Sequence, residues 1–251
     1  MRRLILALTM ALAAVCSAQP AGQWHYDFNL AQPPALWDLT GSYSNEAAGL
    51  RLVNTLHHLP NGQLNGSGTA HYSEGFTVIN ATQTVTGRVS GSSKTRITLN
   101  AKGSGQFTGS AFFVPITGPF MGVLALNLNP TNATVSGNSS GTLCIDGRGC
   151  RTVSTNVSYQ LPPSVDGAWT LALDVTNSHN TVRGSAEAQL SNGETLAFNV
   201  RGSHAPHSGI SRLQLLGTGP ARGTRLTLRL GATNELQALN GKLFGQRLVL
   251  P

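Results

Sequence analysis

Charged residues, aromatic residues and cysteines are all scarce in this sequence. Of its 251 residues, 11% are charged, 6% are aromatic and 3 are cysteines. The shortage of aromatic residues argues against nucleic-acid binding, which uses aromatic stacking platforms, and against a transmembrane barrel with aromatic girdles. The 10 carboxylates include no pair positioned for glycoside hydrolysis and no calcium-binding loop. We therefore expect no nucleic-acid partner and no glycosidase or calcium site.

Apolar runs long enough to span a bilayer are also absent. Arg2 and Arg3 precede an apolar stretch at 4–15, which is too short for a transmembrane helix, and Ala18 stands where a signal peptidase would cut. Residues 1–18 are thus predicted to be a secretory signal peptide. We expect no transmembrane segment after it and a periplasmic or extracellular location.

A lipoprotein signal is the alternative interpretation of the N-terminus. In that case Cys16 would become the lipidated first residue of the processed chain. Bacterial lipoprotein signals usually place a small residue before that cysteine, whereas here it is Val15. This argues for cleavage after Ala18.

Strict alternation of apolar and polar residues is the dominant pattern that the sequence does contain. It is clearest at 168–176, 195–201 and 225–230. A period of two predicts half-buried strands, and strands with one solvent-exposed face are typical of antiparallel sheets. Frequent Asn-Gly and Asp-Gly pairs mark tight reversals, and no segment after the signal has a helical period. We predict an all-β antiparallel meander of roughly 14 strands.

Two pairs of similar stretches indicate an internal repeat. GSGTA at 66–70 resembles GSAEA at 184–188, and RITL at 96–99 resembles RLQL at 212–215. We interpret them as a weak duplication with loop changes. The meander then has pseudo-twofold internal repetition and forms a barrel or a sandwich, with a shallow barrel carrying protruding hairpins as one variant.

The small residues of GSGTA and GSAEA have a packing interpretation. Gly and Ala on one side of a strand leave room for a bulky neighbour to approach the backbone. Trp37 and Trp169 are the expected neighbours. A ligand lying against the same smooth surface is the alternative.

The repeat divides the chain after the signal into two halves. We expect an N-terminal β half at 19–165 with the first copy and a C-terminal β half at 166–251 with the second, either as separate domains or as one continuous β domain. The stretch at 106–165 is less regular, because Pro115 and Pro119 cannot donate to the ladder of a central strand. It is expected to be a sheet edge, a bulged crossing or a connection between the halves.

Cys144 and Cys150 are the two cysteines that remain after signal cleavage. The Asp146-Gly147 turn between them is typical of a hairpin, whose opposite positions lie within bridging distance. A disulfide suits an exported chain, whereas two thiols without a nearby histidine are half of a metal site. We predict a Cys144–Cys150 disulfide, no metal and no cofactor.

Five arginines fall on the polar faces of the predicted C-terminal strands: Arg183, Arg201, Arg212, Arg225 and Arg229. If these strands are neighbours, the arginines form a basic face in a chain whose formal net charge is +7. Such a face suits an anionic glycan or another acidic envelope component. Surface arginines usually do no more than keep a protein soluble and protect strand edges, and this is the interpretation that the sequence alone favours.

Two patterns bear on enzymatic function. The stretch at 137–141 fits the G-x-S-x-G pattern of hydrolases, with Asp174 and His204 following in the hydrolase order. That motif works on a strand-to-helix turn, and no helix is predicted here. His204 and His207 are expected in a solvent-exposed loop, without the partner cluster that would complete a metal site. We therefore predict no catalytic residue.

Together these observations favour an exported, non-enzymatic β-rich module with a structural or interaction role in the cell envelope or at its surface. A binding protein for a lipid, a glycan or another small ligand is the second hypothesis, and a hydrolase is the third. A filled interior would favour the first, an apolar cavity with a few polar groups the second, and a cleft that gathers His, Asp and Ser the third.

Overall fold

The structure is a computed structural model that describes residues 21–31, 35–92, 96–145, 149–161, 165 and 167–250. The elements in this part of the chain are β1 (Gly22–Leu30), β2 (Gly41–Ala47), β3 (Leu50–His58), β4 (Gln63–Glu74), β5 (Thr77–Ser92), β6 (Arg96–Ala111), β7 (Val114–Asn129), β8 (Thr134–Ile145), β9 (Gly149–Gln160), β10 (Trp169–Ser178), β11 (Thr181–Gln189), β12 (Thr195–Ala205), β13 (Ile210–Gly217), the 3-10 helix η1 (Gly219–Ala221), β14 (Arg225–Leu230), β15 (Leu236–Leu243) and β16 (Gln246–Leu250). No helix in these residues is long and apolar enough to cross a membrane. The predicted signal peptide at 1–18, Cys16 within it, and the Asp146-Gly147 turn lie outside the described residues.

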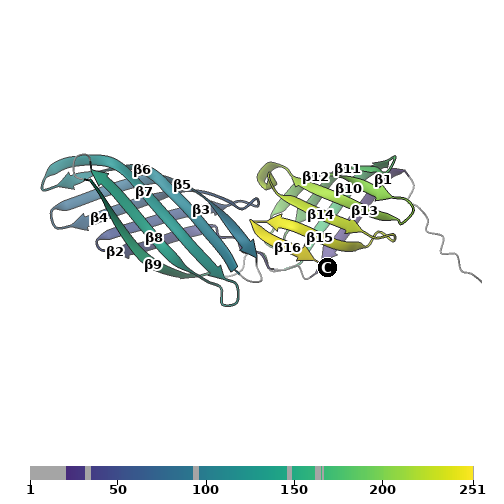
Figure 1. Cartoon of the computed structure of the whole chain (residues 1–251), viewed down its shortest axis with the longest axis horizontal. Coiled ribbons are helices and arrows are strands. Elements are labelled where there is room, and N and C mark those ends of the chain that lie inside the picture. Colours follow the sequence, from purple (N-terminus) through teal and green to yellow (C-terminus); the bar gives the residue numbers. More distant parts are fainter. Residues whose placement is uncertain are drawn as a thin grey trace, which may run out of the picture.

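The strands build one sheet that is antiparallel almost throughout, and the predicted all-β meander is confirmed. In space the sheet consists of two runs of eight strands: the first run is β2–β9 and the second run is β1 followed by β10–β16 (Figure 1). β1 therefore pairs with β10 and not with the strand that follows it in the chain. A short parallel contact between β16 and β5, at Gly91 and Ser92, joins the two runs. Among the described strands the sheet does not close on itself.

The stretches that suggested an internal repeat occupy matching places in the two runs. GSGTA lies in β4, the third strand of the first run, and GSAEA lies in β11, the third strand of the second run. RITL and RLQL lie in the fifth strands, β6 and β13. The two runs thus share one strand order.

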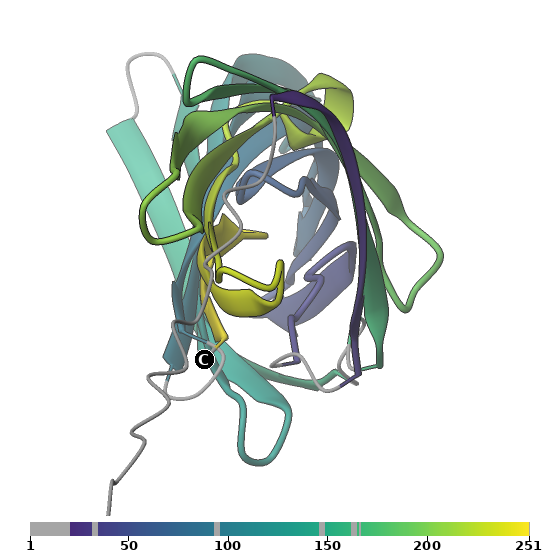
Figure 2. The ribbon, with the colours of Figure 1, turned by 90° about the vertical axis from the view of Figure 1, so that its right-hand side faces the viewer.

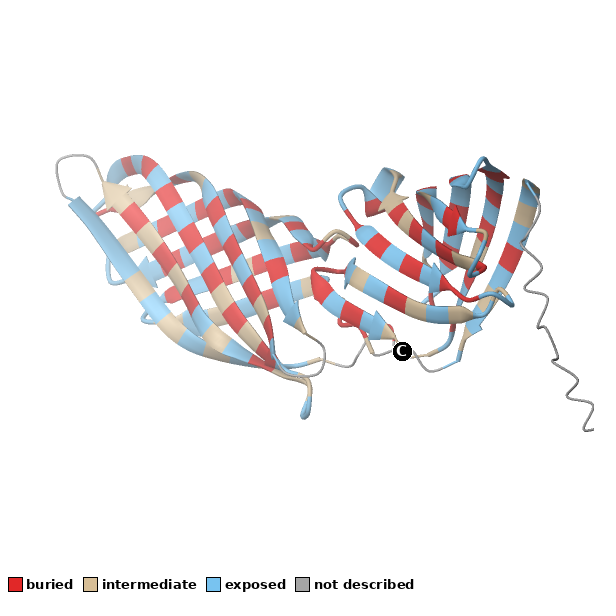
Figure 3. Cartoon of the chain, turned by 45° about the vertical axis from the view of Figure 1, so that its right-hand side comes forward, coloured by how far each residue is buried: buried red, intermediate tan, exposed pale blue. Residues whose placement is uncertain are grey.

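Each run of the sheet is curled (Figure 2). The buried apolar side chains form separate clusters in the two runs. Buried and exposed residues alternate along the strands, which produces the chequered pattern of Figure 3. The second run has one apolar cluster, which extends from Trp169 on β10 to Leu248 on β16. The first run has two clusters, one around Leu126 and the other around Phe120. Burial of such side chains, at about 1.5–3 kcal/mol each, is the main force that holds the sheet in this curled shape.

A polar layer lies between the two apolar clusters of the first run. On the buried face, Gln83 of β5 donates from Nε2 to Oδ1 of Asn54 on β3 over 2.7 Å. Gly68, Gly103 and Gly122 on neighbouring strands leave the space that the Gln83 side chain fills, since a Cβ on any of them would come within 2.6 Å of its amide. The glycines are therefore required here by a buried amide.

This layer corrects the expectation that a tryptophan covers the small residues. The atoms nearest to Gly68 of GSGTA belong to amide side chains and not to Trp37. In GSAEA, by contrast, Ala186 and Ala188 belong to the same buried cluster as Trp169. The aromatic explanation therefore fits the second stretch and is wrong for the first.

The two edge strands of the first run, β2 and β9, contact each other through side chains. The hydroxyl of Tyr159 on β9 donates to the carbonyl of Ser44 on β2 over 3.0 Å, and the ring of Tyr159 packs edge-on against Tyr43. No backbone pairing joins β2 to β9 in the described residues. The first run is thus a curled sheet whose edges touch without forming a ladder.

The region at 106–165 is more regular than its prolines predicted. β6 and β7 are continuous strands of 16 residues each, and they pair from Ala111↔Val114 through to Ile97↔Leu128. In a two-residue hairpin the closing pair is hydrogen-bonded, so odd-numbered residues of β7, including Pro115 and Pro119, point their nitrogens toward β8. Pairing with β8 begins only at Phe120. Both prolines therefore lie where β7 is locally an edge, and no ladder bond is lost.

The contact between the runs depends on two glycines. Gly62 and Gly245 have φ angles of +84° and +71°, and a Cβ on Gly62 would lie 2.5 Å from the Cα of Gly245. Next to them, the backbone N–H of Phe244 donates to the carbonyl of Pro60 over 2.6 Å. Side chains larger than hydrogen would separate the two backbones at this point.

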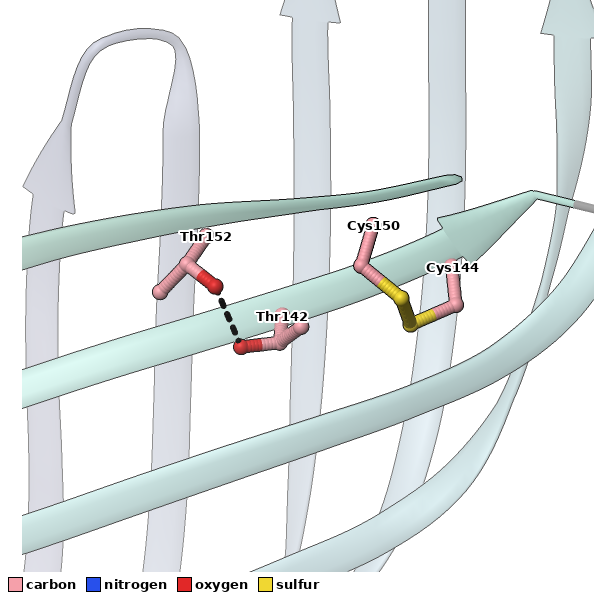
Figure 4. Close-up of a disulfide and its surroundings, with 4 residues drawn as sticks. All are labelled: Thr142, Cys144, Cys150 and Thr152. Carbon is pink, nitrogen blue, oxygen red and sulfur yellow. Dashed lines mark hydrogen bonds between the residues drawn. A yellow bond between two sulfur atoms is a disulfide. The ribbon is translucent and has the colours of Figure 1, made fainter. Parts of the chain in front are cut away.

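The predicted disulfide is present. Cys144 and Cys150 occupy directly opposite positions on β8 and β9 and are bonded to each other (Figure 4). The hydroxyls of Thr142 and Thr152, the next pair on the same face, are 2.9 Å apart and hydrogen-bonded. A bonded pair of cysteines fits a protein of an oxidising compartment.

Candidate functional site

Four arginines form a ladder across the outer face of the second run. Arg183 on β11 lies directly opposite Arg201 on β12, and Arg212 on β13 lies directly opposite Arg229 on β14. Arg201 and Arg212 are diagonal neighbours, because the partner of Arg212 lies two positions beyond Arg201 on β12. In antiparallel sheets opposite Cβ atoms are about 4.5–5.5 Å apart and diagonal residues about 7–8 Å apart. All four side chains are exposed on one face, so the ladder crosses four adjacent strands.

A second row of cations runs alongside this ladder. Arg225 on β14, the fifth arginine predicted for this face, lies directly opposite Lys242 on β15, which lies opposite Arg247 on β16. Arg225 and Arg229 are four positions apart on the extended strand β14, a distance of about 13 Å. Lys242 and Arg247 were not included in the predicted face. The alternation of the last two strands, which places both on the polar side, contains the signal that would have identified them.

Carboxylates are missing from five of the six strands that carry these cations, the exception being β11 with Glu187. β12, β13, β14, β15 and β16 contain no Asp or Glu. The ion pairs in the described part of the chain involve His25, His58 and Arg151, and none of the seven cations of the two rows. Like charges directly opposite each other in a sheet repel. The face therefore carries an uncompensated positive potential, which attracts anions.

The outer surface is hollowed next to the ladder. A shallow depression is lined by Arg183, Arg201 and Arg212 together with Gly184 and Gly202. A Cβ on Gly184 would lie 2.0 Å from the carbonyl oxygen of the neighbouring strand β10, and one on Gly202 would lie 2.2 Å from that of β13. Gly184 and Gly202 alternate with the arginines and share the face of the buried Val182 and Val200, so the missing side chains let the strands approach closely while the glycine backbone lines the depression. A ligand can thus reach the backbone between the arginines.

Acidic side chains lie on the same outer face of the second run, on the strands β1, β10 and β11. Asp27 on β1, Asp174 on β10 and Glu187 on β11 are exposed there. His25 lies between two of them: its Nδ1 is 2.6 Å from Asp174 and its Nε2 is 2.9 Å from Asp27. The hydrogen bond to Asp174 above all, and then the one to Asp27, raise the pKa of His25 above its usual 6.5. The outer face of the second run is therefore divided into an acidic and a basic part.

Ser139, the serine of the G-x-S-x-G stretch, is not a nucleophile on a turn. It lies on the buried face of β8, is 1% exposed, and donates from Oγ to Oδ1 of Asn45 over 2.9 Å. Asp174 and His204, which completed the hydrolase order, lie in the other run and do not meet it. The structure thus gathers no Ser-His-Asp arrangement in the residues that it describes.

His204 is not in the exposed loop that the sequence suggested. It is a buried residue of β12, 3% exposed, with Nδ1 3.0 Å from the hydroxyl of Ser211 and with the ring of Trp24 packed edge-on against it. Burial lowers the pKa of His204, which favours the neutral imidazole. No group of three or more His, Cys, Asp or Glu suited to a metal ion occurs in the described ranges.

No protein-family model, no curated protein sequence and no solved structure shows significant similarity to the chain. The function therefore has to be argued from the geometry of the molecule. The two rows bring seven cations onto one face, and no ion pair among the described residues involves any of them.

Proposed function

We propose that this protein is an exported, non-enzymatic binding module whose basic outer face holds an anionic polymer, such as an acidic glycan of a cell envelope. The observation that carries the proposal is the direct opposition of Arg183 to Arg201 and of Arg212 to Arg229. Three of these four arginines lie on strands that hold no carboxylate, and the fourth, Arg183, shares β11 with Glu187. An anion placed between opposed guanidinium groups replaces a repulsion with two charge-assisted contacts.

The dimensions of the ladder favour a polymer. Strands lie about 4.8 Å apart, so the ladder from β11 to β14 is about 14 Å long. Planar guanidinium groups bind carboxylate, sulfate or phosphate in a bidentate manner, and a row of four suits a chain with regularly spaced acidic groups. The depression beside Gly184 and Gly202 lets such a chain lie close to the sheet.

Other features support the remaining parts of the proposal. The interiors of both runs are occupied by apolar clusters, and Ser139 is buried, which favours a binding module over a hydrolase. The disulfide suits an exported protein, in line with the signal peptide predicted at 1–18. The matching strand order of the two runs supports an internal duplication, of which only the second copy acquired the basic ladder.

Binding to dextran sulfate tests the proposal. We expect the purified protein to bind this polymer but not neutral dextran of the same length, with an affinity that falls as NaCl rises from about 0.05 to 0.5 M. The variant Arg201→Gln, Arg212→Gln, Arg229→Gln should bind at least about tenfold more weakly.

A matched variant controls for net charge. Arg51→Gln, Arg88→Gln, Lys102→Gln removes the same number of exposed cations from strands of the first run. It should leave the affinity for dextran sulfate within about twofold of that of the unmodified protein. At about 0.15 M NaCl the salt screens charges that lie far from the ladder. Equal loss in both variants would show that only net charge matters, and the ladder would then not be the site.

A further inference from the structure

An exposed apolar cluster lies at the end of the first run, far from the contact between the runs (Figure 1). Phe76 in the β4–β5 turn is 65% exposed, and Phe112 and Phe113 in the β6–β7 turn are 70% and 86% exposed. The ring centroid of Phe76 lies 6.1 Å from that of Phe112 and 5.7 Å from that of Phe113. Val78 and Val114, beside the turns, are 40% and 54% exposed. We call these five residues the apolar tip.

The backbone holds two of these rings outward in an unfavourable conformation. Phe112 and Phe113 have φ angles of +50° and +68°. A two-residue hairpin turn with positive φ at both positions normally contains Asn-Gly, because a bulky side chain is strained there. The N–H of Phe112 also donates to the carbonyl of Phe76 over 3.2 Å, which ties the two turns together. Strain of this kind at an exposed position indicates a binding role for the side chains.

Charge is absent from the strands behind the apolar tip. Neither 75–87 nor 103–145 contains a single Asp, Glu, Lys or Arg. Glu74, just before the first turn, is paired with Arg151 over 3.2 Å and also accepts a hydrogen bond from Tyr72. A charged side chain is costly inside a bilayer and tolerable at a protein interface. The uncharged hairpins therefore favour a lipid environment.

The size of the apolar tip also favours lipid over a protein partner. Three phenylalanines of about 200 Å² each, at the exposures given above, offer roughly 450 Å² of aromatic surface. A stable protein interface needs about 800 Å² on each side. A small convex cluster on two hairpin turns is too small for that, whereas it suits shallow insertion among lipid head groups and acyl chains.

We propose that the apolar tip inserts into the interfacial region of a phospholipid bilayer and docks the protein end-on to the membrane surface. The rings of Phe76, Phe112 and Phe113 enter the boundary between head groups and acyl chains. The Glu74–Arg151 pair remains at the level of the head groups. The basic ladder lies in the other run and takes no part in this contact.

Flotation of the full chain with vesicles of phosphatidylcholine alone tests the proposal, because these vesicles have no net charge. We expect the protein to float with them, with little change when NaCl is raised. The variant Phe112→Asn, Phe113→Gly removes two rings and supplies the residues that the turn prefers, so it should fold normally and bind at least about tenfold more weakly. The control variant Val249→Asn removes an exposed apolar residue of the second run and should bind like the unmodified protein.

Three results would overturn the proposal. The first is no flotation of the unmodified protein, or flotation that the Phe112→Asn, Phe113→Gly variant leaves unchanged. The second is flotation that requires anionic lipid and is lost in the variant Arg201→Gln, Arg212→Gln, Arg229→Gln, which would assign lipid binding to the basic ladder. The third is a dimer in sedimentation velocity that disappears in the phenylalanine variant without any flotation, which would make a second copy of the chain the partner.

Discussion

Arg212 and Arg229 lie directly opposite each other on β13 and β14, and no ion pair in the described part of the chain involves either of them. The same holds for Arg183 and Arg201 on β11 and β12. A sheet gains no stability from such pairs, since like charges at opposite positions repel. The free protein is therefore less stable than it would be with a neutral face, and an anionic ligand removes the repulsion.

Neutralising one member of a pair should stabilise the free protein. For Arg212→Gln we expect the free energy of unfolding in low salt to rise by about 0.2–1 kcal/mol, because the repulsion from Arg229 is removed. Urea unfolding measures the change, and the gain should shrink in high salt because salt screens exposed charges. Arg88→Gln is the control and should change little, because Arg88 lies opposite the uncharged Gln63 and Asn100 in the first run. A less stable Arg212→Gln protein would contradict the repulsion.

A methyl group at Gly184 should destabilise the second run. Its Cβ would lie 2.0 Å from the carbonyl oxygen of Asp174 and 2.6 Å from the Cα of Val175, and both atoms belong to the backbone. We expect Gly184→Ala to lower the free energy of unfolding by about 1–3 kcal/mol, as overpacking does. Gly41→Ala is the matched control, since a Cβ there meets nothing within 4 Å. Equal stability of the two variants would show that the strands separate easily at Gly184.

Removing the disulfide should weaken the β8–β9 hairpin. The cysteines are separated by 6 positions, and a loop of this size stabilises the folded state by about 2 kcal/mol through the entropy of the unfolded chain. We expect Cys144→Ser, Cys150→Ser to lose about that much in urea unfolding. The unmodified protein in a reducing agent should behave like the variant. If reductant leaves the unmodified protein unchanged, the bond contributes nothing measurable.

His25 should make stability depend on pH. Its pKa is raised above 6.5 by Asp174 and Asp27, so its pairing stabilises the fold fully below pH 6.5, and this stabilisation is lost as pH rises through the folded-state pKa. The melting temperature of the unmodified protein should accordingly fall over this interval. In His25→Gln that part of the fall should disappear. An NMR titration that places the pKa of His25 at or below 6.5 would contradict the pairing.

Relieving the strain in the β6–β7 turn of the apolar tip should stabilise the protein. Phe112 and Phe113 both have positive φ, which costs of order 1–3 kcal/mol for each non-glycine residue. We expect Phe112→Asn, Phe113→Gly to unfold at a higher temperature than the unmodified protein. Phe76→Asn, which leaves that turn unchanged, should show no such gain. A less stable double variant would mean that the rings contribute packing that outweighs the strain.

Much of the fold could be predicted from local pattern. The alternation at 195–201 and 225–230 corresponds to β12 and β14. The spacing of Cys144 and Cys150 correctly indicated a disulfide across a hairpin. Both predictions rest on neighbours along the chain, where a period of two and a short loop leave few options. At Pro115 and Pro119 the sheet-edge alternative agrees with the structure, because β7 is paired on one side only at these residues, and the strand continues through both prolines.

Part of the candidate site was also within reach of the sequence. Alternation placed all five arginines on polar faces, but it did not say which ones oppose each other. Lys242 and Arg247 belong to the same face and were missed. The apolar tip was missed as well, since a two-residue Phe-Phe turn is not a pairing that turn preferences predict.

The sequence by itself determined the clearly alternating strands, the polar faces that carry the arginines and the position of the disulfide, because these depend on contacts within a few residues. Only the tertiary structure decided that Gly22–Leu30 joins β10, that Arg212 faces Arg229, and that Phe76 meets Phe112. These relationships depend on register and on pairing between distant segments. They are set by the burial of whole strand faces, a sum over many residues that no short stretch contains.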